Sequence, residues 1–228
     1  SLRRDGFLLR THKDGVSKFN AYLEDYAFLI EGLVTLYETT GELRWLNEAL
    51  TLTDLMIDEF WDGENGGFYF TGKSHESLIV RSKDYFDNAT PSGNSVAAGV
   101  LLRLAVLTSN EQYRNLAIAV FREAGGAARR YPSGFGYLLS AIDFLLSTPK
   151  EVAVVGETEG DIEPLLRETW RPYLPNKVVA PNFTGKSELP LLQDRTPVEG
   201  RATAYVCEHY TCKQPVTDPG ELAAQLRL

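Results

Sequence analysis

Acidic and aromatic side chains gather in three parts of this 228-residue sequence, each beside a segment with helical hydrophobic spacing. Carboxylates can act as general acid, general base or hydroxyl acceptor, and aromatic rings can stack on the C–H faces of sugars. We therefore expect a carbohydrate site built from these side chains. The candidate catalytic residues are Glu24, Asp25 and Asp87, and the candidate substrate-binding residues are Tyr22, Tyr26, Trp61, Tyr69, Asp84, Ser92 and Asn94.

Each candidate also has a structural explanation. Glu24 and Asp25 would stabilise the first turn of any helix through its dipole. Asp87 could bond its own turn, and Ser92 and Asn94 are good N-cap residues. Tyrosine and tryptophan often pack in a core. The residue types leave the structural and the functional explanation open.

The tripeptide Pro-Ser-Gly precedes two apolar segments, at residues 91–93 and 132–134. Serine can cap the first amides of a helix, and glycine permits close approach of the backbone. A buried helix needs such a cap because water does not reach its first amides. If both starts face the segment "YLEDY", their N-termini converge on one pocket that favours anions or sugar hydroxyls.

Five segments with helical spacing must position these residues. Segments 22–39, 94–108 and 135–147 are apolar on nearly all sides, whereas segments 42–60 and 111–123 carry a single apolar stripe. Helices of the first kind are expected to be buried on all sides and helices of the second kind to cover them. The alternation predicts a mainly α fold, a partial (α/α) toroid of inner and outer helices, with an irregular helical bundle as the alternative.

The pattern changes after Pro149. Short β-branched runs in "KEVAVVG", "NKVVAP" and "RATAYVC" predict strands, and "DIEPLLRETWRPYL" and "DPGELAAQLRL" predict helices. We therefore expect a helical-hairpin domain at residues 1–149 and a small α/β subdomain at residues 150–228. The chain has neither a G-x-G-x-x-G motif nor a Walker lysine, so no cofactor is expected.

Cys207, His209 and Cys212 lie within six residues of one another. Their spacing is not a standard zinc pattern and no fourth ligand is evident, so no metal is expected. A turn between the two cysteines would permit a disulfide. Two buried or half-buried free thiols are the favoured interpretation.

Composition limits the partners of this chain. Its net charge is -8 and its pI about 5.0, and no basic face is visible, so a nucleic-acid partner is not expected. No run of about 18 apolar residues is present, which argues against a membrane span. With only two cysteines, a cytoplasmic location is the expectation. The sequence begins without Met, and we interpret it as a piece of a longer protein.

Five stretches together resemble the spermatogenesis-associated protein 20-like family. They are "YLEDYAFLIEGLVTLYETTGELRWLNEAL", "FWDGENGGFYFT", "RSKDYFDNATPSGNSVAAGVLLRLAVLT", "EVAVVG" and "AYVCEHYTCKQPVTDP", which together span nearly the whole chain. The resemblance implies the C-terminal part of a protein with an N-terminal thioredoxin-like domain followed by a six-hairpin, glycosidase-like toroid. That domain of the same full-length chain would then be a partner, and Cys207 and Cys212 become redox candidates.

The resemblance also bears on activity. The family's toroid is similar to those of N-acylglucosamine 2-epimerases and glycoside-active enzymes, although a fold does not fix a function. Such epimerases use histidines, and none of His12, His75 and His209 falls on an expected inner helix. Two functions follow: a carbohydrate-active enzyme, or a non-catalytic scaffold that partners the thioredoxin-like domain. A partial toroid would leave apolar helix faces uncovered and favour self-association.

Overall fold

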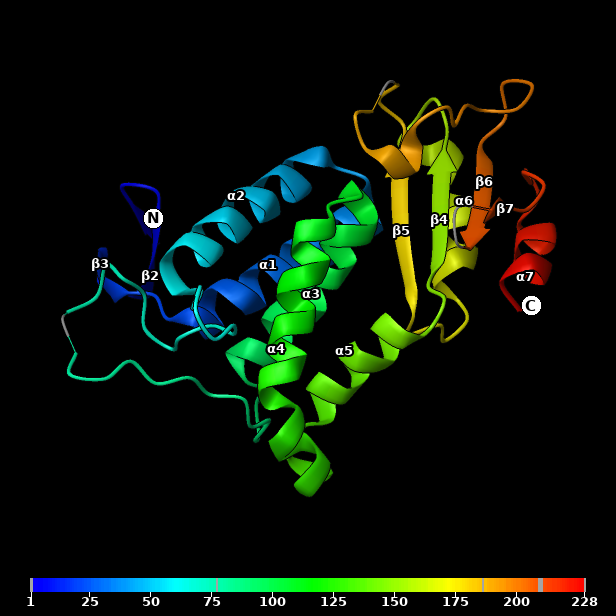
Figure 1. Cartoon of the computed structure of the whole chain (residues 1–228). Coiled ribbons are helices and arrows are strands. Elements are labelled where there is room, and N and C mark those ends of the chain that lie inside the picture. Colours follow the sequence, from blue (N-terminus) through cyan, green and yellow to red (C-terminus); the bar gives the residue numbers. More distant parts are fainter. Residues whose placement is uncertain (1, 77, 186, 209–210, 228) are drawn as a thin grey trace.

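The computed structural model describes residues 2–76, 78–185, 187–208 and 211–227 (Figure 1). The helices are α1 (Leu23–Thr40), α2 (Leu43–Phe60), α3 (Gly93–Thr108), α4 (Glu111–Arg130), α5 (Gly136–Leu146), α6 (Glu159–Trp170) and α7 (Pro219–Arg227). Two 3-10 turns occupy Pro132–Gly134 and Pro190–Leu192. The strands are β1 (Arg3–Arg4), β2 (Phe7–Lys13), β3 (Val16–Asn20), β4 (Lys150–Val155), β5 (Lys177–Asn182), β6 (Thr203–Glu208) and β7 (Thr211–Cys212).

The predicted fold class, a mainly α partial toroid, is wrong. About half of the chain is helical, and the described strands form two separate sheets of three and four strands. The first sheet, β1-β2-β3, is antiparallel and precedes the first helix. Asp5-Gly6 and Asp14-Gly15 form its two turns, and all four residues have positive φ. Asp-Gly is the pair that such tight hairpin turns prefer, so this sheet had a sequence signal that the helical interpretation passed over.

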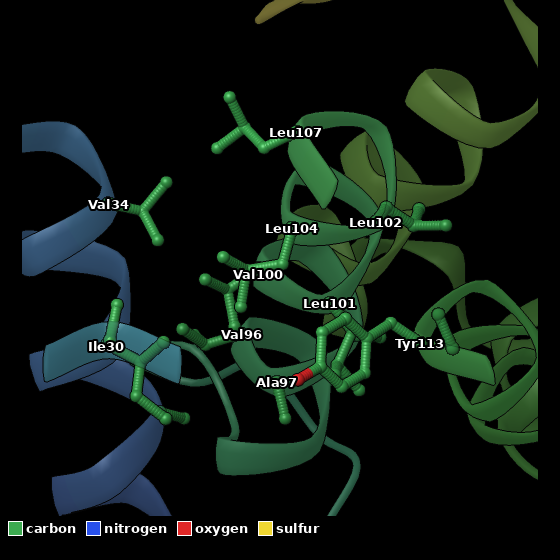
Figure 2. Packing of buried hydrophobic residues seen from close by; sticks show 14 of the residues in the cluster. Ile30, Val34, Val96, Ala97, Val100, Leu101, Leu102, Leu104, Leu107 and Tyr113 are labelled. Atoms are coloured by element: carbon green, nitrogen blue, oxygen red, sulfur yellow. The ribbon is translucent and has the colours of Figure 1, made fainter. Parts of the chain in front are cut away.

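Helix α3 lies at the centre of the helical layer. It packs against α1, α4 and α5, and most of its apolar side chains are buried, whereas Ala105 and Val106 are partly exposed. Figure 2 shows Ile30 and Val34 of α1 facing Val96 and Val100 of α3, with Tyr113 of α4 on the far side of α3. The prediction that segment 94–108 is buried therefore holds for most of its residues, although Ala105 and Val106 are partly exposed.

The same prediction is wrong for the other two broadly apolar helices. On α1, Phe28, Leu29 and Leu36 are exposed, and on α5 Leu139 and Leu146 are exposed. These side chains lie on the helix faces that no neighbouring element covers. Of the three helices with apolar residues on nearly all sides, only α3 has packing partners on nearly all sides.

The second sheet has the strand order β5-β4-β6-β7, with β4 parallel to β5 and antiparallel to β6. Successive residues of a strand point to opposite faces. Val152 and Val154 pack against α6 and α7, whereas Ala153 and Val155 belong to the core that includes the helices α1 to α5. The sheet therefore lies between two helical layers, as Figure 1 shows.

The strands and helices expected after Pro149 are present. The division into separate domains at residues 1–149 and 150–228 stays a prediction. One face of the second sheet packs into the same core as helices α1 to α5. Among the described helices, none has both the length and the apolar character that crossing a membrane would require.

Candidate functional site

The first turns of α1, α3 and α5 lie side by side. A Cβ atom at Gly93, the first residue of α3, would come within 2.9 Å of the Leu23 side chain and 3.1 Å of the Glu24 amide nitrogen. The rings of Phe86 and Phe135, just before α3 and α5, are 4.8 Å apart. Glycine at position 93 is therefore required for the close approach of α3 to α1.

Asp87 joins the starts of α3 and α5. Its Oδ1 accepts a hydrogen bond from the amide of Ser92 at 2.9 Å. Its Oδ2 accepts from the amides of Tyr137 at 2.9 Å and Leu138 at 3.1 Å. The carboxylate thus caps α5 from a position 50 residues earlier in the chain, which supports the structural explanation for this residue.

Glu24 and Asp25 face Arg10 of β2. Nη2 of Arg10 lies 2.9 Å from Oε1 of Glu24, and Nη1 lies 3.2 Å from Oδ2 of Asp25. Asp25 Oδ2 also accepts from the amide of Tyr22 at 2.8 Å, which satisfies the N-cap amide at the start of α1. Both carboxylates therefore share one cation of the chain itself, Arg10.

The aromatic candidates on α1 pack against the chain. The ring of Tyr22 stacks on Phe70 at 4.8 Å and lies 5.1 Å from His75. The hydroxyl of Tyr26, a buried residue, accepts the amide of Leu8 at 3.0 Å. Burial raises the pKa of Tyr26. Tyr26 is a core residue that also anchors the first sheet.

Ser92 and Asn94 organise the start of α3. Ser92 Oγ accepts the amide of Ser95 at 3.1 Å, the N-cap bond expected from sequence. The side chain of Asn94 is fully buried, and it bonds the amide and the carbonyl of Phe68, each at 2.8 Å. It also donates to the carbonyl of Asp84 at 2.9 Å. Asn94 thereby ties two loop segments to α3.

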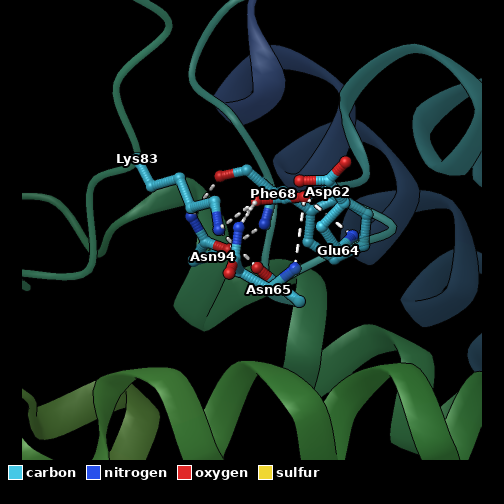
Figure 3. Close-up of polar contacts among 7 residues, drawn as sticks. Asp62, Glu64, Asn65, Phe68, Lys83 and Asn94 are labelled. Carbon is cyan, nitrogen blue, oxygen red and sulfur yellow. Dashed lines mark hydrogen bonds and ion pairs between the residues drawn. The ribbon is translucent and has the colours of Figure 1, made fainter.

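A compact ion pair holds the loop that follows α2 (Figure 3). Nζ of Lys83 lies 2.8 Å from Oδ2 of Asp62, and both side chains are largely buried. Asp62 also accepts from the amide of Glu64 at 2.9 Å and from the amide of Asn65 at 3.3 Å. The hydrogen bond from Lys83, followed by those from the loop amides, holds the pKa of Asp62 far below its usual range.

The two remaining aromatic candidates belong to this loop. Trp61 meets Phe68 edge to face at 4.9 Å. The ring of Tyr69 lies 4.2 Å from the Arg81 guanidinium and 5.3 Å from the Lys83 ammonium. A hydrogen bond to Asp62 raises the pKa of Tyr69. Both rings are thus engaged by neighbouring side chains.

The structure therefore brings most of the predicted site residues into one region, and there their polar groups bond mainly to backbone groups and to Arg10. That these residues bind a ligand stays a prediction. Two cavities have other linings: one lies beside the middle of α3 and the first half of α5, and the other lies at the ends of α3 and α5.

The first cavity, of about 610 Å³, lies between the end of α1, the middle of α3, the first half of α5 and the connection from α6 to β5. We call it the α5 cavity. Its aromatic and polar lining includes Glu38, Arg103, Tyr137, Ser140, Phe144, Trp170, Tyr173, Asn176 and Lys177.

A buried ion pair forms one wall of the α5 cavity. Nη2 of Arg103 lies 2.5 Å from Oε2 of Glu38, and the Glu38 side chain is 1% exposed. The other oxygen, Oε1, has no hydrogen bond of normal geometry among the described residues. Burial raises the pKa of Glu38, although Arg103, the backbone amide of Val179 and Lys177 act in the opposite direction.

Two further polar groups face the same space. Lys177 donates to the carbonyl of Thr169 at 2.7 Å, and its ammonium lies 4.4 Å from the centre of the Trp170 ring. Burial lowers the pKa of Lys177, while Glu38 acts to raise it. The hydroxyl of Tyr137 donates to Glu31, and its pKa is raised by burial and by that hydrogen bond.

The charged residues of the α5 cavity were not among the site residues predicted from the sequence, although the sequence contains a signal for them. Arg103 is the only charged residue in the otherwise apolar segment 94–108. A lone charge in a buried helix requires a partner, because an unpaired buried charge is costly. What the sequence does not provide is the partner, which lies 65 residues away.

The second cavity, of about 450 Å³, lies between the end of α3, the end of α5 and the second sheet. We call it the disulfide cavity, because Cys207 and Cys212 line it and are joined by a disulfide bond. The interpretation of these residues as free thiols is therefore wrong. The two residues are directly opposite in the β6–β7 pairing, so strand register brings their sulfurs together. His209 of the proposed zinc pattern lies outside the described residues.

Comparison with known proteins identifies relatives of the chain. No protein-family model matches it. It is 36% identical over 208 residues to spermatogenesis-associated protein 20 of Rattus norvegicus, and 35% identical over 208 residues to the protein of that name from Homo sapiens. Each alignment covers 88% of this chain and 26% of the relative. An uncharacterized protein of Caenorhabditis elegans is 26% identical over 213 residues, or 92% of this chain and 29% of the relative. The chain thus spans about a quarter of the length of these relatives.

Proposed function

We propose that this chain, a homologue of spermatogenesis-associated protein 20, binds a neutral carbohydrate in the α5 cavity. The carrying observation is the combination of aromatic side chains at the mouth of that cavity with charged groups that already have partners within the chain. The volume of about 610 Å³ suits a small ligand, since such sites usually measure about 300–1,000 Å³.

Exposed aromatic rings support the ligand class. Trp170 is 37% exposed and Tyr173 is 91% exposed, and both line the cavity. Lys177 lies against the Trp170 ring and restrains it. A ring of this kind offers a flat apolar surface on which the C–H face of a sugar can stack.

Hydrogen-bonding groups for hydroxyls surround the rings. Ser140 and Asn176 line the cavity with neutral polar side chains, and Arg103 contributes guanidinium N–H donors. A ligand with several hydroxyl groups could satisfy such a mixed set of donors and acceptors.

The charge of the cavity favours a neutral ligand. Among the described residues, its lining contains the cations Arg103, Arg171 and Lys177 and the carboxylate Glu38. Arg103 is paired with Glu38, Arg171 lies 3.4 Å from Glu168, and Lys177 donates to the carbonyl of Thr169. A phosphate would have to compete with these partners for its donors. Because Glu38 is 1% exposed and paired with Arg103, we propose binding, and assign no catalytic role to this carboxylate.

The α5 cavity suits a carbohydrate better than the starts of α1, α3 and α5, where the sequence predicted the site. There, Glu24 and Asp25 are paired with Arg10, and Asp87 is bonded to three backbone amides. A sugar would have to displace these contacts, whereas in the α5 cavity the aromatic faces are already exposed.

Titration with simple sugars tests the proposal. Glucose, mannose, xylose and N-acetylglucosamine would be added at millimolar concentration, with chemical shifts of the labelled chain as the readout. We expect at least one sugar to shift resonances of residues 170–177 and of α5. Tyr173→Ala and Trp170→Ala should weaken that binding by about 3- to 10-fold.

Tyr131 provides the matched control. It is an exposed tyrosine, 62% accessible, outside the lining of the α5 cavity. Tyr131→Ala should bind the sugar as the unmodified chain does. Absence of any sugar-induced shift, or an equal loss in Tyr131→Ala and Tyr173→Ala, would refute a carbohydrate site in this cavity.

A second candidate function is that of a scaffold for another domain of a longer protein, the thioredoxin-like domain expected from the family resemblance. It is favoured by the exposed apolar side chains of α1, which are Phe28, Leu29 and Leu36. Mixing the chain with that domain should then slow hydrogen exchange of α1, and Leu36→Ser should abolish the effect. Concentration-dependent light scattering of the chain alone would instead indicate self-association through the same face.

A further inference from the structure

We propose that the Cys207–Cys212 disulfide is a redox-active site, which a protein dithiol reduces through Cys212 while Arg195 stabilises the thiolate of that residue. The site is separate from the α5 cavity, so this proposal does not depend on carbohydrate binding. It rests on the position of the two sulfurs, on the arginine beside them and on the cavity that they line.

The disulfide contributes little to the closure of the chain. Cys207 and Cys212 are five positions apart and lie opposite each other on paired strands. In the chain-entropy account, the stabilisation from a cross-link grows with the length of the loop that it closes. Here the loop is short, so the cross-link stabilises the chain less than one that closes a long loop.

Arg195 lies against both sulfurs. Its Nη2 is 2.9 Å from Sγ of Cys212 and 3.7 Å from Sγ of Cys207. Its guanidinium also lies over the ring of Tyr205, at 5.0 Å from the ring centre. A neighbouring cation lowers the pKa of a thiol and so favours the thiolate, which is the reactive form.

A hydrogen bond holds the backbone next to Arg195 in place, and so helps to keep the guanidinium beside the two sulfurs. The hydroxyl of Tyr205 donates to the carbonyl of Thr196 at 2.7 Å, which ties the segment to β6. The Nε atom of Arg195 is buried without a hydrogen-bond partner among the residues that the structure describes. Burying a guanidinium N–H group without a partner lowers the stability of the fold. Such a group is consistent with a site where Arg195 must stabilise the negative charge of a cysteine thiolate.

Access distinguishes the two sulfurs. Both cysteines line the disulfide cavity, but Cys207 is 2% exposed whereas Cys212 is only partly buried. The cavity wall also contains Leu102, Phe144 and Leu191, and its charged groups besides Arg195 are Glu111, Arg114 and Glu151 among the described residues. Glu151 lies directly opposite Cys207 in the β4–β6 pairing, so the cation Arg195 faces Cys212 and a carboxylate neighbours Cys207. An incoming thiolate can therefore reach Cys212 more readily than Cys207.

The order of the thiol–disulfide exchange follows from the greater accessibility of Cys212. A thiolate of the protein dithiol attacks Sγ of Cys212, the bond between the two cysteine sulfurs breaks, and Cys207 leaves as a thiolate. The second thiol of the reductant gives its proton to Cys207 and attacks its own partner sulfur in the mixed disulfide. Cys212 then leaves as a thiolate beside Arg195. Two electrons have passed from the dithiol, now a disulfide, to Cys207 and Cys212.

Trapping of the mixed disulfide tests the order of attack. The oxidised chain would be incubated with a thioredoxin whose second active-site cysteine is replaced by serine, and the cross-linked peptides identified by mass spectrometry. We expect a covalent complex through Cys212. A complex through Cys207, or no complex while the chain remains folded and oxidised, would overturn the proposal.

Alkylation of Cys212 tests the role of Arg195. In Cys207→Ser, the rate of reaction with iodoacetamide is measured against pH, and its midpoint should lie below the ordinary thiol value of about 8.5. Adding Arg195→Gln should raise the midpoint and slow the reaction at pH 7 by about 3- to 10-fold, whereas Arg195→Lys should retain most of the rate.

Arg114 lines the same cavity and is the matched control. Arg114→Gln should leave the midpoint unchanged, and circular dichroism confirms that each variant is folded. If Arg195→Gln does not fold, the midpoint in Cys207→Ser alone decides. A midpoint at or above the ordinary value, or equal effects of Arg195→Gln and Arg114→Gln, would contradict the proposed role.

Discussion

Nη2 of Arg103 in α3 lies 2.5 Å from Oε2 of Glu38 in α1, and this carboxylate is only 1% exposed. The pair joins two helices that also share a large apolar contact. Removing the arginine leaves a buried carboxylate unpaired, which typically costs about 3–5 kcal/mol. We therefore expect Arg103→Met to lower the free energy of unfolding by about that amount at pH 7, as measured by urea denaturation.

The loss in free energy of unfolding caused by Arg103→Met should depend on pH. Burial raises the pKa of Glu38, so the folded chain binds this proton more tightly than the unfolded chain does. The contribution of the group to stability is then greatest below the unfolded pKa of about 4.3, and it falls as pH rises through the folded pKa. Loss of Arg103 raises that pKa further, so the deficit should grow between about pH 4 and pH 7. A deficit independent of pH would contradict the pairing, and exposed Arg114→Met should show little loss.

The second prediction compares the helix caps. Asp87 bonds three amides at the starts of α3 and α5, and Ser92 caps the amide of Ser95. Asp87→Ala and Ser92→Ala should each reduce the free energy of unfolding by about 1–2 kcal/mol. Ser133, in the second Pro-Ser-Gly, is exposed in a 3-10 turn. Ser133→Ala should therefore change stability by less than about 0.5 kcal/mol, and an equal loss in Ser92→Ala and Ser133→Ala would argue against this assignment of caps.

The third prediction concerns Asp62 and Lys83, which are 2.8 Å apart in the loop after α2. The pKa of Asp62 is lowered first by the hydrogen bond from Lys83, so the ionised carboxylate stabilises the fold above its unfolded pKa of about 3.9. That contribution is lost as pH falls through the lower folded pKa. Asp62→Asn should cost about 1–3 kcal/mol at pH 7, and the difference from the unmodified chain should shrink below about pH 4.

Asp58 is the control for this measurement, because its ion pair with Lys73 is largely solvent-exposed. Asp58→Asn should have little effect on urea denaturation at any pH. If Asp62→Asn behaved in the same way, the ion pair in Figure 3 would have no part in holding the loop.

Local patterns in the sequence predicted most of the elements. Hydrophobic spacing located the five helices before Pro149, and β-branched runs located β4, β5 and β6. The N-cap role of Ser92 was also readable, because capping depends on the few residues at one helix end. The first sheet was missed, although Asp5-Gly6 and Asp14-Gly15 are strong hairpin signals.

The candidate site was less predictable. Glu24, Asp25, Asp87 and Asn94 were selected by residue type, but the type does not show that Arg10, two helix amides and Phe68 would be their partners. The same carboxylate can bind a substrate or cap a helix, and only the identity of the group that it contacts decides between these roles.

By itself, the sequence determined where the helices and the strands β4, β5 and β6 form, because spacing and caps act over a few residues. Tertiary structure decided which apolar faces are buried. Helix α3 has neighbours on all sides, whereas α1 leaves Phe28 and Leu29 exposed despite a similar pattern. It also decided the pairing of Glu38 with Arg103, 65 residues apart, and the contact of Arg195 with Cys212. Such contacts depend on how whole elements pack, and no local pattern specifies which distant charge will fill a given buried position.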